Sequence, residues 1–190
     1  MQTHDPQQDR ETDSDDVIIA ATQRWLEKAV IGLNLCPFAK AVHVKRQIRY
    51  VVSPATTVEA LIEDLLHELQ LLAADPDEIE TTLLVHPRVL GDFLDYNDFL
   101  DIADATVDEL ELDGVLQVAS FHPHYQFADS HPDDMGNFSN RAPYPTLHLL
   151  REDSVDKAVA AFPDAGKIYE NNIATLEKLG PAGWAALFGR

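Results

Sequence analysis

Three histidines border one long segment whose residues follow neither a helical nor a strand period. His122 and His124 form an HPH motif near the start of this segment, residues 121–145, and His148 follows in the next apolar stretch. Neutral imidazoles are good ligands for zinc, iron and nickel, so the three histidines together could bind a divalent metal. The chain has neither an HExxH motif nor a pair of cysteines, so the spacing alone does not demand a metal.

Two of these histidines also have catalytic interpretations. An imidazole changes charge near neutral pH, so His122 is a candidate general acid or base. His148 lies inside an apolar strand sequence, where it is either a catalytic residue or a core histidine with satisfied hydrogen bonds. Residues 121–145 themselves predict a site, because connections longer than about 12–15 residues are usually functional or disordered.

The single cysteine, Cys36, follows the end of a predicted helix in the segment GLNLCPFAK. A thiolate is favoured at helix N-termini and beside cations, so a buried, unreactive thiol is the simpler interpretation here. Cys36 is still a candidate nucleophile, because a histidine or arginine distant in the sequence could activate it in the folded protein.

The end of the long segment, NRAPYP at residues 140–145, combines rigidity with polar side chains. Its two prolines restrict the backbone, so Asn140, Arg141 and Tyr144 lie on a stiff, extended stretch. The guanidinium of Arg141 offers a rigid fork for a carboxylate or phosphate, which predicts substrate binding. In the alternative interpretation Arg141 pairs with Asp133 or Asp134 and fastens the segment to the sheet.

The cations of this acidic chain are unevenly distributed. With 33 acidic and 14 basic residues the net charge is −19, which repels phosphate backbones and anionic membranes. Neither nucleic acid nor a membrane is therefore an expected partner. Four cations fall close together: Lys40, Lys45, Arg46 and Arg49. If the fold gathers them with Arg141 and Arg151, a small anionic molecule could bind there; otherwise they neutralise surface carboxylates.

Composition predicts one soluble globular domain. The 190 residues include 45% hydrophobic and 25% charged side chains, which is ordinary for a soluble protein. The chain has no apolar run of the roughly 18–20 residues that a membrane helix needs, and no signal-peptide pattern. One cysteine permits no internal disulfide, so we expect a cytoplasmic protein. Residues 1–15 predict a disordered acidic tail, and residues 16–190 the globular domain.

Hydrophobic periodicity predicts a first helix over residues 16–31 and then alternating strands and helices. The predicted strands cover residues 46–53, 81–87, 114–120 and 146–152. The later helices cover residues 56–75, 92–110, 154–161, 165–179 and 181–188. This order predicts an α/β (α+β) sandwich, in which helices pack on a mixed sheet of about four strands.

Several long segments resemble one protein family. GLNLCPFA, TTLLV, YNDFLD, QVASFHPHYQF, NRAPYPTLHLLRE and NNIATLEKLG are similar to the bacterial domain-of-unknown-function family 1415, over about residues 17–180. The resemblance implies no activity, substrate or cofactor, only where the hallmark segments of the family fall here. They include Asn34 and Cys36, His122, the NRAPYP segment and His148. At Ala142 we expect Ser from the family, so a catalytic serine is not predicted.

These residues support three hypotheses. The first is a small-molecule enzyme, a hydrolase or group-transfer enzyme on an anionic substrate, with its pocket at the carboxyl ends of the strands and residues 121–145 as wall or lid. Its catalytic candidates are His122, Cys36 and His148. Its substrate-binding candidates are Arg141, Asn140, Tyr144, Arg46 and Asn34. The second is a non-catalytic domain that uses the same segment to bind a metabolite, a metal or a protein, and the third is a purely structural segment.

Overall fold

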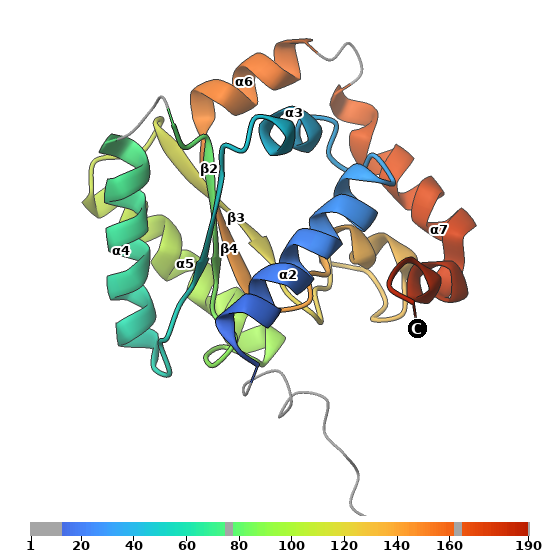
Figure 1. Ribbon diagram of the computed structural model, residues 1–190, viewed down its shortest axis with the longest axis horizontal. Helices are drawn as coiled ribbons and strands as arrows, with labels where there is room; N and C mark the ends of the chain where they lie inside the picture. The colour runs from blue at the N-terminus through green and yellow to red at the C-terminus, as the bar shows by residue number, and fades with distance from the viewer. Residues whose placement is uncertain (1–12, 75–77, 162–164, 190) are drawn as a thin grey trace, which may run out of the picture.

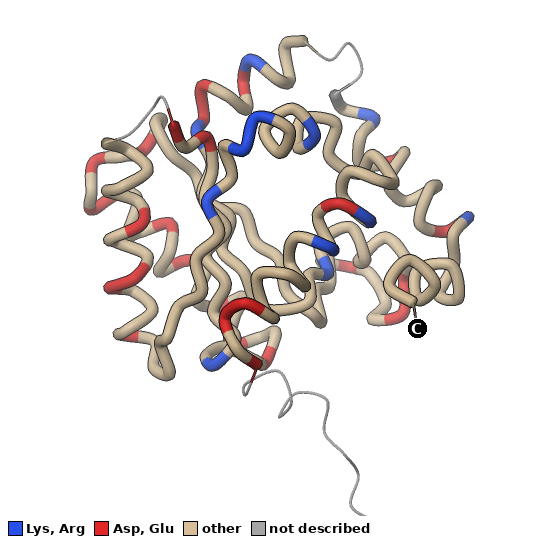
Figure 2. The backbone as a smooth tube through the Cα atoms, viewed as in Figure 1, with Lys and Arg blue, Asp and Glu red and all other residues tan. Residues whose placement is uncertain are grey.

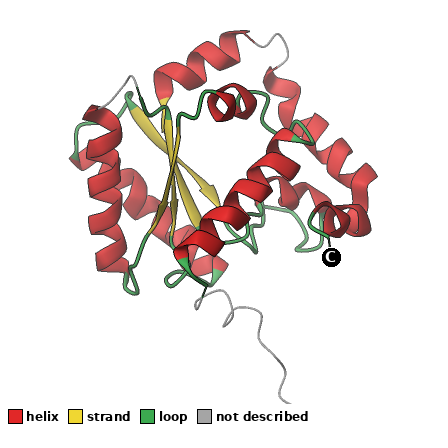
Figure 3. Ribbon diagram, in the orientation of Figure 1, coloured by secondary structure: helices red, strands yellow, loops and turns green. Residues whose placement is uncertain are grey.

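Four strands form one mixed sheet, and helices lie on both of its faces (Figure 1, Figure 3). This computed structural model describes residues 13–74, 78–161 and 165–189. The strands are β1 (Ile48–Val52), β2 (Thr81–Val85), β3 (Leu116–Phe121) and β4 (Thr146–Arg151), in the order β1-β2-β4-β3. β1 and β2 are parallel, whereas β4 is antiparallel to both of its neighbours. The predicted α+β fold with a mixed four-stranded sheet is confirmed.

The first face of the sheet packs against α4 (Val58–Ala74) and α5 (Phe93–Glu109), and together they form the main core. The buried helical positions are Leu61, Leu65, Leu69 and Leu72 on α4 and Tyr96, Phe99, Ala103 and Val107 on α5. Their spacing of three to four residues produces one apolar stripe on each helix. The Asp92 carboxylate caps α5 by accepting hydrogen bonds from the backbone of Leu94 and Asp95.

The remaining α-helices and one π-helix lie on the other side of the sheet (Figure 1). They are α2 (Asp15–Trp25), the π-helix η1 (Leu26–Ile31), α3 (Ala39–Val44), α6 (Glu152–Ala161) and α7 (Ile168–Leu187). α2 and η1 together match the first predicted helix. α3 was not predicted, because its six residues bury no side chain and show no apolar stripe.

Two shorter features complete the chain. A 3-10 helix, η2 (Met135–Asn140), lies inside the segment predicted to be irregular, and a second, η3 (Ala165–Lys167), precedes α7. Gly180 has a left-handed backbone (φ 65°) and breaks α7 at the point where two helices were predicted. No helix of the described residues is long and apolar enough to cross a membrane.

The predicted tail, residues 1–15, lies mostly outside the described residues. Its last residue, Asp15, is the first residue of α2. Within the described part of the tail, Asp13 Oδ2 accepts a 2.6 Å hydrogen bond from the hydroxyl of Tyr144. The beginning of α2 is thus fastened to the segment that precedes β4.

Candidate functional site

Side chains on the second face of the sheet form three rows across the strands. The first row is Ile48, Thr81, Leu150 and Gln117; the second is Tyr50, Leu83, His148 and Ala119; the third is Val52, Val85, Thr146 and Phe121. Ile18 of α2 packs on Val85, and the ring centroid of Trp25 lies 5.0 Å from that of Phe121. α2 therefore covers the third row and leaves most of the other two to α3 and α6.

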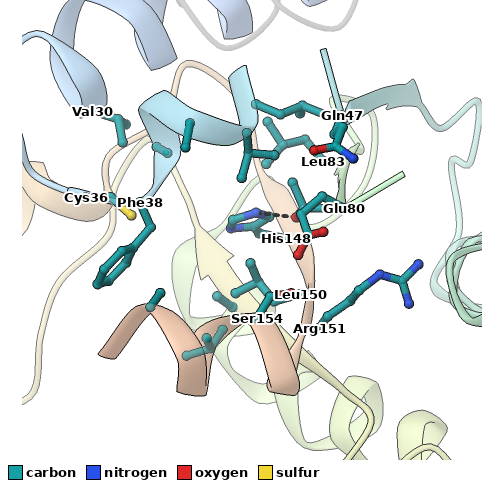
Figure 4. Close-up of a pocket in the computed structure, with 18 of the residues that line it drawn as sticks. Val30, Cys36, Phe38, Gln47, Glu80, Leu83, His148, Leu150, Arg151 and Ser154 are labelled. Carbon is teal, nitrogen blue, oxygen red and sulfur yellow. Dashed lines mark hydrogen bonds between the residues drawn. The ribbon is translucent and has the colours of Figure 1, made fainter. Parts of the chain in front are cut away.

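A pocket of about 640 Å³ lies over these two rows (Figure 4), and we call it the face pocket. Its floor consists of Ile48, Thr81, Leu83, Gln117, Ala119, Phe121, His148 and Leu150. Its walls come from η1, residues 36–38, α3 and α6. Because the floor begins at Ile48 and Thr81, the face pocket lies over the amino ends of β1 and β2. The sequence had placed a pocket at the carboxyl ends of the strands.

His148 is a polar residue in this largely apolar floor, and its tautomer follows from its neighbours. Its Nε2 atom lies 2.7 Å from Thr81 Oγ1, and that hydroxyl donates to the Leu149 carbonyl at 2.6 Å (Figure 4). The only hydroxyl hydrogen is thereby used, so Nε2 must carry a hydrogen and donate to Thr81. Burial lowers the pKa of His148 to about 4, so the ring is neutral at pH 7. Its Nδ1 lone pair has no hydrogen-bond partner among the described residues.

Gln117 provides a second polar group on the floor. It is the register partner of Leu150, so it is a diagonal neighbour of His148 across β3 and β4. The Cα atoms of such diagonal positions are about 7–8 Å apart, within reach of long side chains, so one small ligand group can contact both residues. The amide of Gln117 makes no hydrogen bond with any residue that the structure describes.

Cys36 reaches the wall of the face pocket because the helix before it ends in a π-helical turn. The Val30 carbonyl accepts from the backbone N–H of Leu35 at 2.9 Å and of Cys36 at 3.5 Å. Rare π-helical turns frequently occur at functional sites. The thiol is free and half-buried, and its sulfur lies next to Phe38 (Figure 4). Cys36 and His148 thus line one pocket, but no hydrogen bond joins them. Asn34 is exposed, with a left-handed backbone (φ 56°).

Positive charge beside the face pocket comes from Lys45 and Lys157. Arg151 also lines the pocket, but its guanidinium points away and donates to the carbonyls of Leu72 and Ile79 (Figure 4). Figure 2 shows Lys and Arg along the segment from α3 to β1, whereas α4 and α5 carry acidic residues and no Lys or Arg. The predicted cation cluster is only partly assembled here. Arg46 is exposed and outside the pocket lining, and Arg49 forms an ion pair with the buried Glu68 at 2.7 Å.

His122 lies on the opposite side of the sheet from His148. It is fully buried against α5, with its ring centroid 5.0 Å from that of Tyr96. Its Nε2 atom lies 3.3 Å from the Leu90 carbonyl, and its Nδ1 atom accepts from the backbone N–H of His124 at 3.0 Å. Burial lowers its pKa to about 4. Both ring nitrogens therefore already have protein partners.

The predicted metal ligands are consequently not gathered in one place. His124 is exposed, with its ring centroid 5.9 Å from that of His122, while His148 belongs to the face pocket. Among the residues that the structure describes, no three His, Cys, Asp or Glu side chains are arranged to hold a metal ion.

The polar residues of the long segment mainly bind one another. Arg141 donates to the carbonyls of Tyr125 and Pro132 at 3.1 and 2.6 Å, and lies over the Phe138 ring. Buried Asn137 bonds to Phe127, Ser130 and His131. Asn140 donates to the Ser120 carbonyl, and Tyr144 is buried. Arg141 thus fastens the segment as one interpretation predicted, although through carbonyls rather than through Asp133 or Asp134.

Sequence reasoning did not select Thr81 or Gln117. A usable signal was present, because strand alternation places each on the same face as an apolar neighbour two residues away. Selecting them required the strand order, which brings Thr81 next to His148, and that order cannot be derived from alternation alone.

The comparison with known proteins gives one finding. No curated protein and no solved structure matches the chain. Residues 17–186 match the family described as "Protein of unknown function (DUF1415)", which covers most of the chain and agrees with the resemblance in its hallmark segments. The chain belongs to that family.

Proposed function

We propose that this protein binds a small, mostly apolar organic molecule in the face pocket. One observation carries the proposal: two rows of the sheet lie under a pocket of about 640 Å³ that contains an unpartnered histidine nitrogen. Pockets for small molecules typically measure about 300–1,000 Å³ and combine apolar walls with a few polar groups. The ligand-binding hypothesis from the sequence is thus kept, with the pocket in place of residues 121–145.

The short helices beside the pocket support this proposal. Neither α3 nor α6 buries a side chain, and Val42 and Val155 face the pocket instead of a core. Apolar surface gains about 25 cal/mol for each Å² removed from water. A ligand in the face pocket would therefore stabilise both helices by covering this surface.

The test uses Trp25, which lines the face pocket, as an internal probe. The chain has two tryptophans, so the Trp184→Phe variant leaves Trp25 as the single emitter. Titration with 1-anilinonaphthalene-8-sulfonate (ANS) should quench Trp25 and enhance ANS emission through energy transfer. Ala119→Leu, which fills the floor beside His148, should weaken ANS binding by about tenfold or more. Ala105→Leu, on the exposed side of α5, is the matched control and should leave binding unchanged.

The proposal fails if ANS does not quench Trp25, or if Ala119→Leu binds ANS as tightly as Ala105→Leu does. Circular dichroism of both variants establishes that each is folded before the titrations are compared. Either result would leave residues 121–145 as the candidate binding segment.

A second candidate function is catalysis in the same pocket, because Cys36 and His148 both line it. In this proposal the thiol gives its proton to His148 Nδ1 and the sulfur attacks an acyl carbon. A thioester forms, and the leaving alcohol takes the proton from His148. Water then hydrolyses the thioester to the acid. Turnover of p-nitrophenyl esters that Cys36→Ala and His148→Phe both abolish would support catalysis; binding without turnover supports a binding protein.

The free thiol of Cys36 also supports a proposal about the cellular compartment of the protein. We propose that the protein works in a bacterial cytoplasm, because a reducing compartment keeps a lone pocket cysteine as a thiol. Cysteine labelling in intact cells with a membrane-permeant and an impermeant maleimide would separate this location from an external one.

A further inference from the structure

The polar groups of the face pocket define what a ligand must offer. Thr81 fixes the tautomer of His148, so the ring presents an acceptor at Nδ1 and no donor to the pocket. A ligand group that donates a hydrogen bond satisfies this nitrogen. A group that only accepts would face its lone pair and gain nothing there.

Gln117 adds the complementary requirement. Its amide offers two N–H donors and one carbonyl acceptor, and it is the diagonal neighbour of His148 on the same face. A hydroxyl group between the two residues would donate to His148 Nδ1 and accept from the Gln117 amide. An ether or ketone oxygen could meet only Gln117.

Provided that the face pocket binds a small molecule as proposed above, we infer that its ligand is a mostly apolar alcohol or phenol whose hydroxyl lies between His148 and Gln117. The apolar walls take the carbon skeleton of this ligand. The hydroxyl supplies the one group that matches both polar residues of the floor.

A carboxylate fits the same position poorly. It has no hydrogen to donate, so His148 would have to be protonated to bind it. Burial lowers the pKa of His148 to about 4, so protonating its ring at pH 7 is unfavourable. This cost lowers the affinity for a carboxylate that needs the protonated ring by about 10³-fold. Glu80 also lines the pocket and opposes the charge of Lys45 and Lys157. The floor therefore favours a neutral group over the anion expected from the sequence.

Three probes with one ring system separate these possibilities. They are 2-naphthol, which donates and accepts; 2-methoxynaphthalene, which only accepts; and 2-naphthoate, which is anionic. Each is titrated at pH 7 into the full chain labelled with ¹⁵N-histidine and followed by NMR. We expect 2-naphthol to bind about 3–10-fold more tightly than 2-methoxynaphthalene, which corresponds to one hydrogen bond. The Nδ1 resonance of His148 should move, while Nε2 keeps its hydrogen.

Two variants remove one polar group each. His148→Phe keeps a ring of similar shape, and Thr81 retains its bond to Leu149. Gln117→Met keeps the length of the side chain and replaces its amide, so it serves if His148→Phe does not fold. Each should bring the affinity of 2-naphthol toward that of 2-methoxynaphthalene.

The possible outcomes are distinct. Equal binding of 2-naphthol and 2-methoxynaphthalene would overturn the hydroxyl inference and leave the pocket proposal standing. If 2-naphthoate binds more tightly than 2-naphthol and His148 becomes protonated, the hydroxyl inference is also overturned, and the pocket takes an anion instead. If ANS does not quench Trp25 and no probe moves the His148 resonances, the proposed function itself is wrong; if ANS does quench Trp25 while no probe moves them, only the hydroxyl inference is overturned.

Discussion

At the residue scale, the chemistry of the face pocket depends on His148 and its partner Thr81, and only His148 was selected from the sequence. Cys36 and His148 were selected as reactive types, and both line the pocket. Thr81, which decides the tautomer of His148, lies 67 residues away in the sequence. Side-chain type can be read from a sequence, but the hydrogen-bond partner depends on which strands become neighbours.

Arg141 illustrates the opposite case, in which a residue selected for binding has a structural role. Its donors are engaged by two backbone carbonyls, so little of the guanidinium fork remains for a ligand. We expect Arg141→Ala to lower the free energy of unfolding by about 1–3 kcal/mol, because it removes charged hydrogen bonds and the contact with Phe138. Urea unfolding measures this change.

The matched control is Arg46→Ala, which removes an equal charge from an exposed position and should change stability by less than about 0.5 kcal/mol. ANS affinity should be the same in both variants and in the parent chain. A stable Arg141→Ala variant that loses ANS binding would instead restore Arg141 as a binding residue.

At the element scale, strong apolar periodicity predicted well and weak periodicity did not. α4 and α5 were predicted within one or two residues at each end, because each has a full buried stripe. α3 and η2 were missed, since neither is long enough to show a period. The long segment holds its shape through side-chain bonds to carbonyls, such as those of Asn137, which leave no periodic signal.

The two weakly packed helices beside the face pocket lead to a prediction about dynamics. α3 and α6 have no buried residue, so their amides should exchange with solvent through local opening at low free-energy cost. Occupying the face pocket with saturating ANS should slow hydrogen exchange in residues 39–44 and 152–161 by roughly 3–10-fold. Mass spectrometry of peptic peptides measures this rate.

The internal control is α4, on the other side of the sheet, whose exchange should not change. The Ala119→Leu variant should lose the effect in α3 and α6. Uniform slowing across all peptides would contradict a local pocket effect, because it would indicate global stabilisation.

At the scale of the whole molecule, the fold class was predictable and the pocket was not. Alternating strands and helices indicated a helix-covered sheet, and the structure confirms one with mixed strand directions. The pocket exists because α2 covers mainly one of the three side-chain rows. That coverage depends on the crossing of α2 over the sheet, a tertiary property that no local pattern records.

The stability of the whole molecule should depend on pH through its buried histidines. His86 and His122 are fully buried, and burial lowers the pKa of each to about 4 from an ordinary 6.5. The folded state therefore holds both rings neutral, whereas the unfolded state takes up protons as the pH falls below 6.5. Stability conferred by neutral burial is fully present above pH 6.5 and is lost as the pH falls toward 4.

Between pH 7.5 and pH 5.0, each of these histidines should lower the free energy of unfolding by about 2 kcal/mol. His148, whose pKa burial also lowers to about 4, should contribute in the same direction. Histidine side chains titrate within this range, whereas Asp and Glu side chains titrate mainly below it, so we expect the histidines to dominate the change. Urea unfolding at the two pH values measures the difference. His86→Phe should reduce this difference by about 2 kcal/mol whatever its own stability, whereas His67→Gln on the exposed side of α4 should leave it unaltered. Equal stability of the parent chain at both pH values would show that the buried histidine rings are not held neutral. These rings would then be more accessible to protons than their packing indicates.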